Sequence, residues 1–457
     1  MLAHRYIFVK TQSATGSDQE TSGRLFAAAK VPGSAVQGGT LNHWVRCLVA
    51  GLALAAPFWA PAPARPVAAT SFGTGQLGVL SSVSAVSAND AWAVGEGTDA
   101  VTGAHTTLAL HWNGATWAPV ASPNPGGTTT SGENSALDGV SAVSAKDVWA
   151  VGSYANPTTG AHESLVEHWN GSGWRQVASP NPGGTGSSGS GTNLQAVSAV
   201  SAKDLWVVGG YLDPASGADR TLIWHGDGKR WTRVSSPSPG GSNQNDLSDL
   251  DGVHGVSARD AWAVGEYSTK AKSSGRDTVV LHWNGTRWTR VASPNALGAS
   301  TKRVTNLASV AAVSAHFAMA VGTFSPDPST SALESLAMRW TGTRWVQVAS
   351  PDPGGTADPS DFTNLSAVAA LSPRDAWAVG EATDSSTRAV DSVVLHWNGR
   401  KWSRFSSPNP STTATYLFAV AAVSARAAWA VGSYYDSATK SDYTLILRWD
   451  GTSWLPA

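Results

Sequence analysis

Five Asp–His pairs are the most regular residues in the sequence that could do chemistry. Each pair lies within one copy of a repeated stretch. The pairs are Asp90 and His111, Asp147 and His168, Asp204 and His225, Asp260 and His282, and Asp375 and His396. In the two copies that lack the Asp, at Phe317 and Ala427, the His is also replaced, by Arg339 and Arg448. This covariation predicts a hydrogen bond between carboxylate and imidazole within each of the five copies.

The same residue types could also serve catalysis or bind a metal. Together with Ser144, the pair Asp147 and His168 could form a nucleophilic triad. An active site is built once, however, whereas this pair recurs five times. Nothing brings three histidines together within one repeat, as a zinc site would need. We therefore predict a structural role for the pairs, and we expect no catalytic residue, no metal and no cofactor.

Acids and tyrosines form a second recurring set. Several copies place one just after the Gly of a Trp-Ala-Val-Gly core, and others place an acid before the next strand-like segment. The candidate ligand-binding residues are Glu96, Tyr154, Tyr211, Glu266, Tyr267, Asp277, Glu381, Asp391 and Tyr434. On one rim, such side chains could bind sugar hydroxyls or a cation. A solvated rim without a ligand is the alternative interpretation.

The Trp-Ala-Val-Gly core that positions these residues recurs seven times. Its first residues are Trp92, Trp149, Trp206, Trp262, Met319, Trp377 and Trp429, spaced by about 57 residues until a last interval of about 52. A fixed period of this length is typical of repeat architectures.

Each copy contains four short segments with the alternation of β-strands. In the second copy they are residues 137–144, 148–152, 165–169 and 174–178, and Asn170-Gly171 joins the last two as a two-residue hairpin would. Four antiparallel strands in each of seven repeats of about 57 residues predict an all-β, seven-bladed β-propeller. A β-solenoid has shorter coils, and an up-and-down barrel needs no long loop after every fourth strand.

Tryptophan is unusually abundant, with 22 Trp against 8 Tyr. With a two-residue turn at Asn284-Gly285, Trp283 and Trp288 become diagonal neighbours on one face of the hairpin. Burial of each indole contributes at most roughly 5 kcal/mol, so we expect these tryptophans to hold neighbouring blades together. The alternative interpretation is a ring of tryptophans that stack on sugars. After the fourth strand, Ser-Pro-Asn-Pro stretches such as residues 122–125 are predicted to end the outer strand.

The ends of the chain and its charge define the remaining expectations. Residues 1–45 lack repeat character and stay unassigned. They are either a disordered N-terminal segment or residues that precede the true start of translation. Residues 46–69 resemble a secretory signal peptide, with cleavage expected after Ala64 or Ala69, and residues 70–457 form the propeller. A buried apolar segment and a signal anchor are the alternatives. The seventh repeat stops within its fourth strand, so we expect residues 65–76 to complete the last blade.

The net charge of −1 shows no basic excess, which argues against a nucleic-acid partner. The single cysteine, Cys47, lies outside the repeats, so the repeats contain no disulfide and no catalytic thiol. We expect a secreted monomer with no membrane span once the signal is removed.

Two families resemble these repeats. The stretch Val208-Gly209-Gly210-Tyr211 resembles the kelch repeat, and the core with its Asn-Gly corner and following Trp is similar to Asp-box and photosystem-assembly-factor propellers. The corner is shorter than a full Asp-box, as in residues 282–288. Related folds include galactose oxidase, which needs a Cys that the repeats lack, and sialidases, which need three arginines in one pocket. Arg220, Arg276, Arg303 and Arg388 lie in or near long loops, but no spacing links them.

These observations predict a binding protein. The turns after strands one and three are tight and share one face, while the loops after strands two and four are long and share the other. Loops on a rigid scaffold commonly carry binding. We expect a secreted, non-enzymatic module that recognises a carbohydrate or a cell-surface protein. The alternatives are a scaffold that holds a partner protein and a glycan-active enzyme of the sialidase type.

Overall fold

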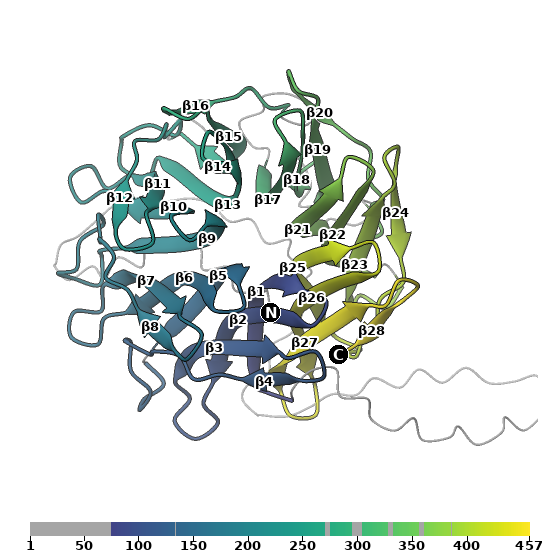
Figure 1. Cartoon of the computed structure of the whole chain (residues 1–457), viewed down its shortest axis with the longest axis horizontal. Helices are drawn as coiled ribbons and strands as arrows, with labels where there is room; N and C mark the ends of the chain where they lie inside the picture. The colour runs from purple at the N-terminus through teal and green to yellow at the C-terminus, as the bar shows by residue number, and fades with distance from the viewer. Residues whose placement is uncertain are drawn as a thin grey trace, which may run out of the picture. The chain divides into compact units, whose positions relative to one another are not determined.

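The computed structural model describes residues 75–132, 134–269, 275–294, 304–327, 332–355, 361–384 and 386–457. The unassigned head, the signal-like segment and Arg303 lie outside these residues. The described chain forms seven four-stranded antiparallel sheets and no helix, which confirms the predicted seven-bladed β-propeller (Figure 1).

The strands of each blade follow one another in the chain, from the innermost to the outermost. Blades 1 and 2 contain β1 (Gly78–Ser87), β2 (Asp90–Thr98), β3 (His105–Trp112), β4 (Trp117–Pro119), β5 (Ser135–Ser144), β6 (Asp147–Ala155), β7 (His162–Trp169) and β8 (Trp174–Gln176). Blades 3 and 4 contain β9 (Thr192–Ser201), β10 (Asp204–Leu212), β11 (Asp219–Gly226), β12 (Trp231–Arg233), β13 (Leu247–Ser257), β14 (Asp260–Ser268), β15 (Asp277–Trp283) and β16 (Trp288–Arg290). Blades 5 and 6 contain β17 (Thr305–Ser314), β18 (Phe317–Phe324), β19 (Glu334–Trp340), β20 (Trp345–Gln347), β21 (Thr363–Ser372), β22 (Asp375–Thr383), β23 (Val390–Trp397) and β24 (Trp402–Phe405). Blade 7 contains β25 (Thr415–Ser424), β26 (Ala427–Asp436), β27 (Ser441–Trp449) and β28 (Trp454–Pro456).

The ring closes where blade 7 meets blade 1. The innermost strand β1 lies against both β5 of blade 2 and β25 of blade 7. All four strands of blade 7 come from the seventh repeat, so β28 is the fourth strand and no segment before residue 76 is needed to supply it. The chain before β1 instead bridges to β27: the Thr444 amide donates to the Gln76 carbonyl at 3.1 Å, and Leu77 pairs with Tyr443. Residues 65–74 lie outside the described part of the chain.

The hairpin between the third and fourth strands differs from the expected two-residue turn. Trp283 pairs directly with Trp288, so four residues form the loop and the two indoles are cross-strand partners rather than diagonal neighbours. The Asn284 side-chain oxygen accepts hydrogen bonds from the amides of Thr286 and Arg287, at 3.0 and 3.1 Å. Gly285 has φ of 90°, a conformation that glycine adopts without strain. The Asn-Gly dipeptide is therefore explained by a longer turn that the Asn side chain closes.

Tryptophans pack neighbouring blades against each other, as expected. Trp92 on β2 of blade 1 contacts Trp169 and Trp174 of blade 2, with ring centroids 4.9 and 5.2 Å apart. The Trp169 indole N–H also donates to the Ala145 carbonyl in the tight turn of its own blade, at 3.1 Å. These indoles are committed to the blade interfaces, which leaves no ring of exposed tryptophans in the described residues for stacking on sugars.

Serines join the innermost strands of several blades. The Ser84 hydroxyl of blade 1 accepts the Ala142 amide of blade 2 at 3.0 Å, and Ser141 of blade 2 accepts the Ala199 amide of blade 3 at the same distance. An innermost strand has one edge without a neighbouring strand in its own sheet. These hydroxyls satisfy amides on that edge and connect one blade to the next.

The Ser-Pro-Asn-Pro stretches do more than end the outer strand. In blade 1 the Asn124 side-chain oxygen accepts the Thr107 amide at 2.6 Å, and Thr107 Oγ1 bonds Ser122 Oγ at 2.7 Å. The linker is thereby fastened onto the third strand. A hydroxyl residue recurs at the position of Thr107 in the other six blades: Ser164, Thr221, Thr278, Ser335, Ser392 and Thr444.

The loops after the second strands are shorter and more regular than expected. In blades 1 to 3 they span six residues, and each begins with an Asp or Asn whose side chain accepts amides further along the loop. In blade 1, Asp99 accepts the amides of Val101 and Thr102 at 2.9 and 2.8 Å. These loops, with the linkers after the fourth strands, define what we call the long-loop end of each blade. The turns after the first and third strands define the short-turn end.

Candidate functional site

The five Asp–His pairs lie near the short-turn end, each within a single blade. The hydrogen bond that the sequence predicts is present in all five, with Nε2 and Oδ1 2.8 to 2.9 Å apart. Each imidazole also packs on the tryptophan of the second strand, as in Trp149 and His168, whose ring centroids are 4.1 Å apart. In blade 7, Arg448 takes the place of the His and its guanidinium lies 5.2 Å from the Trp429 ring centroid. The structural role predicted for the pairs from the sequence stays a prediction, with which their repetition in five blades is consistent.

The nine predicted ligand-binding residues lie toward the long-loop end but are spread over six blades. The second strands carry Glu96, Tyr154, Tyr211, Glu266, Tyr267, Glu381 and Tyr434, and the third strands carry Asp277 and Asp391. The strand register places Tyr267 opposite Asp277 in blade 4. The structure does not gather the set into one pocket.

Most of these side chains are bound within their own blade. Glu96 contacts His105, and this hydrogen bond raises the pKa of the His105 imidazole. The Tyr154 hydroxyl donates to Glu163 at 2.7 Å, and burial together with this bond raises the pKa of Tyr154 to about 12. Glu381 is buried and accepts the Asn364 amide group at 2.9 Å. These contacts hold the long-loop ends of the second and third strands in place.

The arginines considered for a sialidase-type pocket lie apart. Arg220 contacts Asp213 in blade 3, and Arg276 contacts Glu266 in blade 4. Arg388 contacts Asp361 in blade 6, and Arg303 lies outside the described residues. Each of these three arginines therefore contacts a different carboxylate in a different blade, and the structure does not bring the three together.

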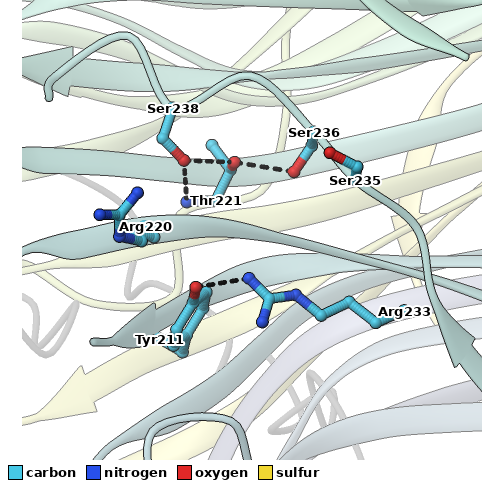
Figure 2. A pocket seen from close by; sticks show the side chains of 7 residues that line it. All are labelled: Tyr211, Arg220, Thr221, Arg233, Ser235, Ser236 and Ser238. Carbon is cyan, nitrogen blue, oxygen red and sulfur yellow. Dashed lines mark hydrogen bonds between the residues drawn. The ribbon is translucent and has the colours of Figure 1, made fainter. Parts of the chain in front are cut away.

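Blade 3 carries a hollow of about 390 Å³ at its long-loop end (Figure 2). Its lining residues are Tyr211, Arg220, Thr221, Arg233, Ser235, Ser236 and Ser238. Tyr211 comes from the end of β10, Arg220 and Thr221 from the start of β11, and the others from the end of β12 and the linker that follows. Tyr211 is the one predicted candidate among them.

Two guanidinium groups and several hydroxyls face this hollow. Arg233 donates from Nη2 to the Tyr211 hydroxyl, and its guanidinium carbon lies 4.5 Å from the Tyr211 ring centroid. Arg220 donates from Nε to Asp213 at 2.8 Å. Thr221 Oγ1 lies 2.9 Å from the hydroxyls of both Ser236 and Ser238. The hollow is therefore lined by two cationic groups, one aromatic ring and several hydroxyl groups.

Comparison of the repeats with one another could have found this site from the sequence. The position of Arg220 carries an acid in four other blades: Glu163, Asp277, Glu334 and Asp391. The position of Ser238 carries a longer side chain in five others: Asn124, Asn181, Asn295, Asp352 and Asn409. Residues that recur in most repeats identify the strands and turns of the blade. Blade 3 is distinguished instead by Arg220 and Ser238, which differ from the residues at the same positions in other repeats.

Other buried carboxyl groups have altered pKa values. Burial, with a contribution from the charge of Glu96, raises the pKa of Asp138 on β5 to about 7. Burial also raises the pKa of Glu167 on β7 to about 8. In the described part of the chain, no group of three or more His, Cys, Asp and Glu side chains is arranged to hold a metal ion. The same residues contain no helix long and apolar enough to cross a membrane.

No protein-family model matches the sequence, and no curated protein matches it. Among solved structures, the chain is similar to YCF48 bound to D1 peptide, with 13% identity, a TM-score of 0.44, and coverage of 82% of this chain and 92% of that one. It is also similar to a fucose-specific lectin from Aleuria aurantia, with 14% identity, a TM-score of 0.41, and coverage of 72% and 95%.

A third similar structure is the GH74 xyloglucanase from Xanthomonas campestris, with 16% identity, a TM-score of 0.49 and coverage of 81% of this chain. The match spans 54% of the xyloglucanase chain. These similarities concern general architecture, and the assignment of the fold rests on the strand topology described above. The resemblance to kelch and Asp-box repeats stays a prediction from the sequence.

Proposed function

We propose that this chain is a secreted, non-enzymatic propeller that binds carbohydrate at the long-loop end of blade 3. The observation that carries the proposal is the hollow between β10, β11 and the linker after β12. Its lining combines a tyrosine, two arginines and several hydroxyl groups, which are suited to hydrogen-bonding a sugar's hydroxyls. A concave site with a few convergent polar groups is the usual form of a ligand pocket.

The hollow also argues for binding rather than hydrolysis. Most glycoside hydrolases place two carboxyl groups on opposite sides of the scissile bond. The seven residues that line the hollow include no Asp and no Glu. A saccharide held there would meet donors that fix its position, without the acid and base that cleavage needs.

A scaffold that holds a partner protein is the second candidate. Such an interface commonly presents an extended apolar patch. In the described residues, the large apolar side chains that are exposed are Val86, Val101 and Leu455. They lie on β1, in the loop after β2 and on β28, which are three separate elements. This distribution favours the carbohydrate over the protein partner.

The proposal can be tested on an array of soluble glycans and cell-wall polysaccharides probed with the full-length protein. Arg233→Ala removes an exposed side chain of the hollow. Its control is Arg290→Ala, because Arg290 makes the same pair with Tyr267 in blade 4, at 2.9 Å from the hydroxyl and 4.6 Å from the ring centroid. We expect saturable binding to a subset of glycans, weakened by Arg233→Ala and unchanged by Arg290→Ala. A flat array would overturn the proposal, and new reducing ends on a bound glycan would make the protein an enzyme.

Export is the remaining part of the proposal. It is supported by residues 46–69, where a basic residue precedes an apolar run and a stretch of small residues and prolines. We expect protein recovered outside the producing cells to begin near residue 65 or residue 70. Recovery of the uncleaved chain inside the cells alone would contradict export.

A further inference from the structure

We propose that the hollow on blade 3 selects an anionic saccharide, one that carries carboxylate or sulfate groups, through the guanidinium groups of Arg220 and Arg233. This inference rests on the carbohydrate-binding function proposed above and specifies its ligand. It follows from how blade 3 differs from the other six blades at positions that the repeat makes equivalent.

The first difference is a reversal of charge at the start of the third strand. Where blade 3 has Arg220, four other blades have an acid, and the remaining two have Thr106 and Tyr443. At the end of the fourth strand, the position of Arg233 carries Gln, Arg or Pro in the other blades. Those residues are Pro119, Gln176, Arg290, Gln347, Arg404 and Pro456. Blades 4 and 6 therefore combine an acid with an arginine at these two positions, whereas blade 3 combines two arginines.

The charges in the hollow do not cancel. Asp213 accepts Arg220 Nε, and the hydroxyl of Ser216 and the amide of Ala215 contribute to lowering the Asp213 pKa, so this carboxylate is ionised at neutral pH. Arg233 contacts the Tyr211 hydroxyl and ring, and no carboxylate among the described residues lies within salt-bridge distance of it. Of the two guanidinium groups that line the hollow, one therefore has a salt-bridge partner and the other, that of Arg233, has none among the described residues. Guanidinium groups bind carboxylate and sulfate through paired N–H donors, and packing on a ring fixes their orientation.

The second difference is the size of the linker side chain that lines the hollow together with the arginines. In blade 1 the Asn124 oxygen accepts the Thr107 amide, and in blade 3 the shorter Ser238 accepts the Thr221 amide at 3.2 Å. The strand is still fastened, but the smaller side chain leaves room in front of it. Ser235 adds a further hydroxyl, which blade 6 also has at Ser406, where four blades have Ala: Ala121, Ala178, Ala292 and Ala349. The space and the donors therefore occur together with the two arginines.

The test compares matched ligands by titration calorimetry with the full-length protein. The ligands are an oligogalacturonate, the same oligosaccharide with its carboxyl groups reduced to alcohols, and a sulfated oligosaccharide of similar length. Arg220→Asp introduces the residue type that blade 4 has at Asp277. Arg287→Asp makes the same change of charge in the exposed hairpin turn at the short-turn end of blade 4.

We expect one of the two anionic ligands to bind about tenfold or more tightly than the neutral one. Arg220→Asp should remove that preference and Arg287→Asp should retain it. Arg220→Gln, which can still donate to Asp213, should also lose the preference while it melts at the temperature of the parent. Preferred binding of the neutral ligand, or equal loss in Arg220→Asp and Arg287→Asp, would overturn the inference and leave carbohydrate binding intact. Absence of binding to these three ligands and to every glycan on the array would instead overturn the proposed function itself.

Discussion

At the scale of single residues, Glu167 is the clearest exception to its surroundings. It lies on β7 at a position where the other blades have an apolar side chain: Leu110, Trp224, Leu281, Met338, Leu395 and Leu447. The side chain is fully buried, and neither carboxyl oxygen has a hydrogen-bond partner among the residues that the structure describes. Burial disfavours the charged form, which raises the pKa to about 8. Blade 2 therefore contains a carboxylic acid that keeps its proton at neutral pH.

This burial costs stability in a definite pH range. In the unfolded chain Glu167 loses its proton near its ordinary pKa of 4.5, while in the folded chain it keeps it up to about pH 8. The penalty is absent below pH 4.5, grows above it and is complete above pH 8. It amounts to about 3 kcal/mol at pH 7, at 1.36 kcal/mol per unit of pKa difference.

We expect Glu167→Leu to raise the free energy of unfolding, because leucine fits the other blades and removes the penalty. The gain should be largest near pH 8 and shrink toward pH 4.5. Urea unfolding of the variant and the parent protein across this pH range measures the difference between their free energies of unfolding. Groups that titrate alike in both proteins cancel from this difference. Glu167→Gln should remove the same pH dependence with a smaller gain, since an unsatisfied polar group remains. A difference that does not change with pH would show that Glu167 is already ionised when buried.

At the scale of elements, the corner between the third and fourth strands varies in one blade. Six blades begin this corner with Asn or Asp, whose side-chain oxygen accepts two amides; Asp450, for example, accepts those of Thr452 and Ser453 at 2.7 and 2.8 Å. Blade 5 begins it with Thr341, whose hydroxyl accepts one amide, that of Arg344 at 3.3 Å, and donates to the Arg344 carbonyl at 2.9 Å. The shorter side chain therefore accepts one amide fewer than the Asn or Asp of the other corners.

Thr341→Asn reproduces the Asn-Gly-Thr-Arg corner of blade 4, in which Asn284 accepts the amide and hydroxyl of Thr286 and the Arg287 amide. The variant loses the hydroxyl bond to the Arg344 carbonyl and gains an acceptor for the Thr343 amide and hydroxyl, so we expect it to stabilise the protein by up to about 1 kcal/mol. The matched control is Thr343→Asn, which places the same side chain two residues later in the same exposed corner. The measurement is the midpoint of urea unfolding of each variant relative to the parent, provided that the m-value is unchanged. Equal midpoints for the two variants would show that the side chain of the first corner residue does not hold the turn.

The elements were predictable from the sequence because period and alternation determine them. The seven cores, the four strands per repeat and the Asp–His pairs all follow from residues that recur. The hairpin register was wrong, since Asn-Gly is compatible with both a two-residue and a four-residue turn and only the Trp283–Trp288 pairing distinguishes them. The hollow on blade 3 was missed for a different reason. It depends on Arg220 and Ser238, which depart from the repeat, and on a linker whose path over the third strand no local pattern reveals.

At the scale of the whole propeller, one blade interface differs from the other six. Blades 1 and 7 are not joined by a linker, so the interface between them, which we call the seam, is held by non-covalent contacts alone. Trp429 of blade 7 contacts Trp112 and Trp117 of blade 1, with ring centroids 4.9 and 5.2 Å apart. The positions of the serines that connect other innermost strands are Ala419 and Ala421 in blade 7. The seam therefore lacks the hydroxyl contacts of the first blades as well as a covalent link.

We expect Trp429→Ala to open the ring at the seam before the blades themselves unfold. The control is Trp206→Ala at the interface of blades 3 and 4, where Trp206 lies 5.0 Å from Trp283 and 5.1 Å from Trp288. Both substitutions remove a buried indole and should cost about 3–5 kcal/mol. In Trp206→Ala the linker keeps the two blades together, so reclosure is favoured by their proximity. Hydrogen exchange should show selective loss of protection in β1 and β25–β28 for Trp429→Ala and none at the seam for Trp206→Ala. The same uniform loss of protection in both variants would mean that the ring opens and unfolds as one unit, with the seam no weaker than its other interfaces.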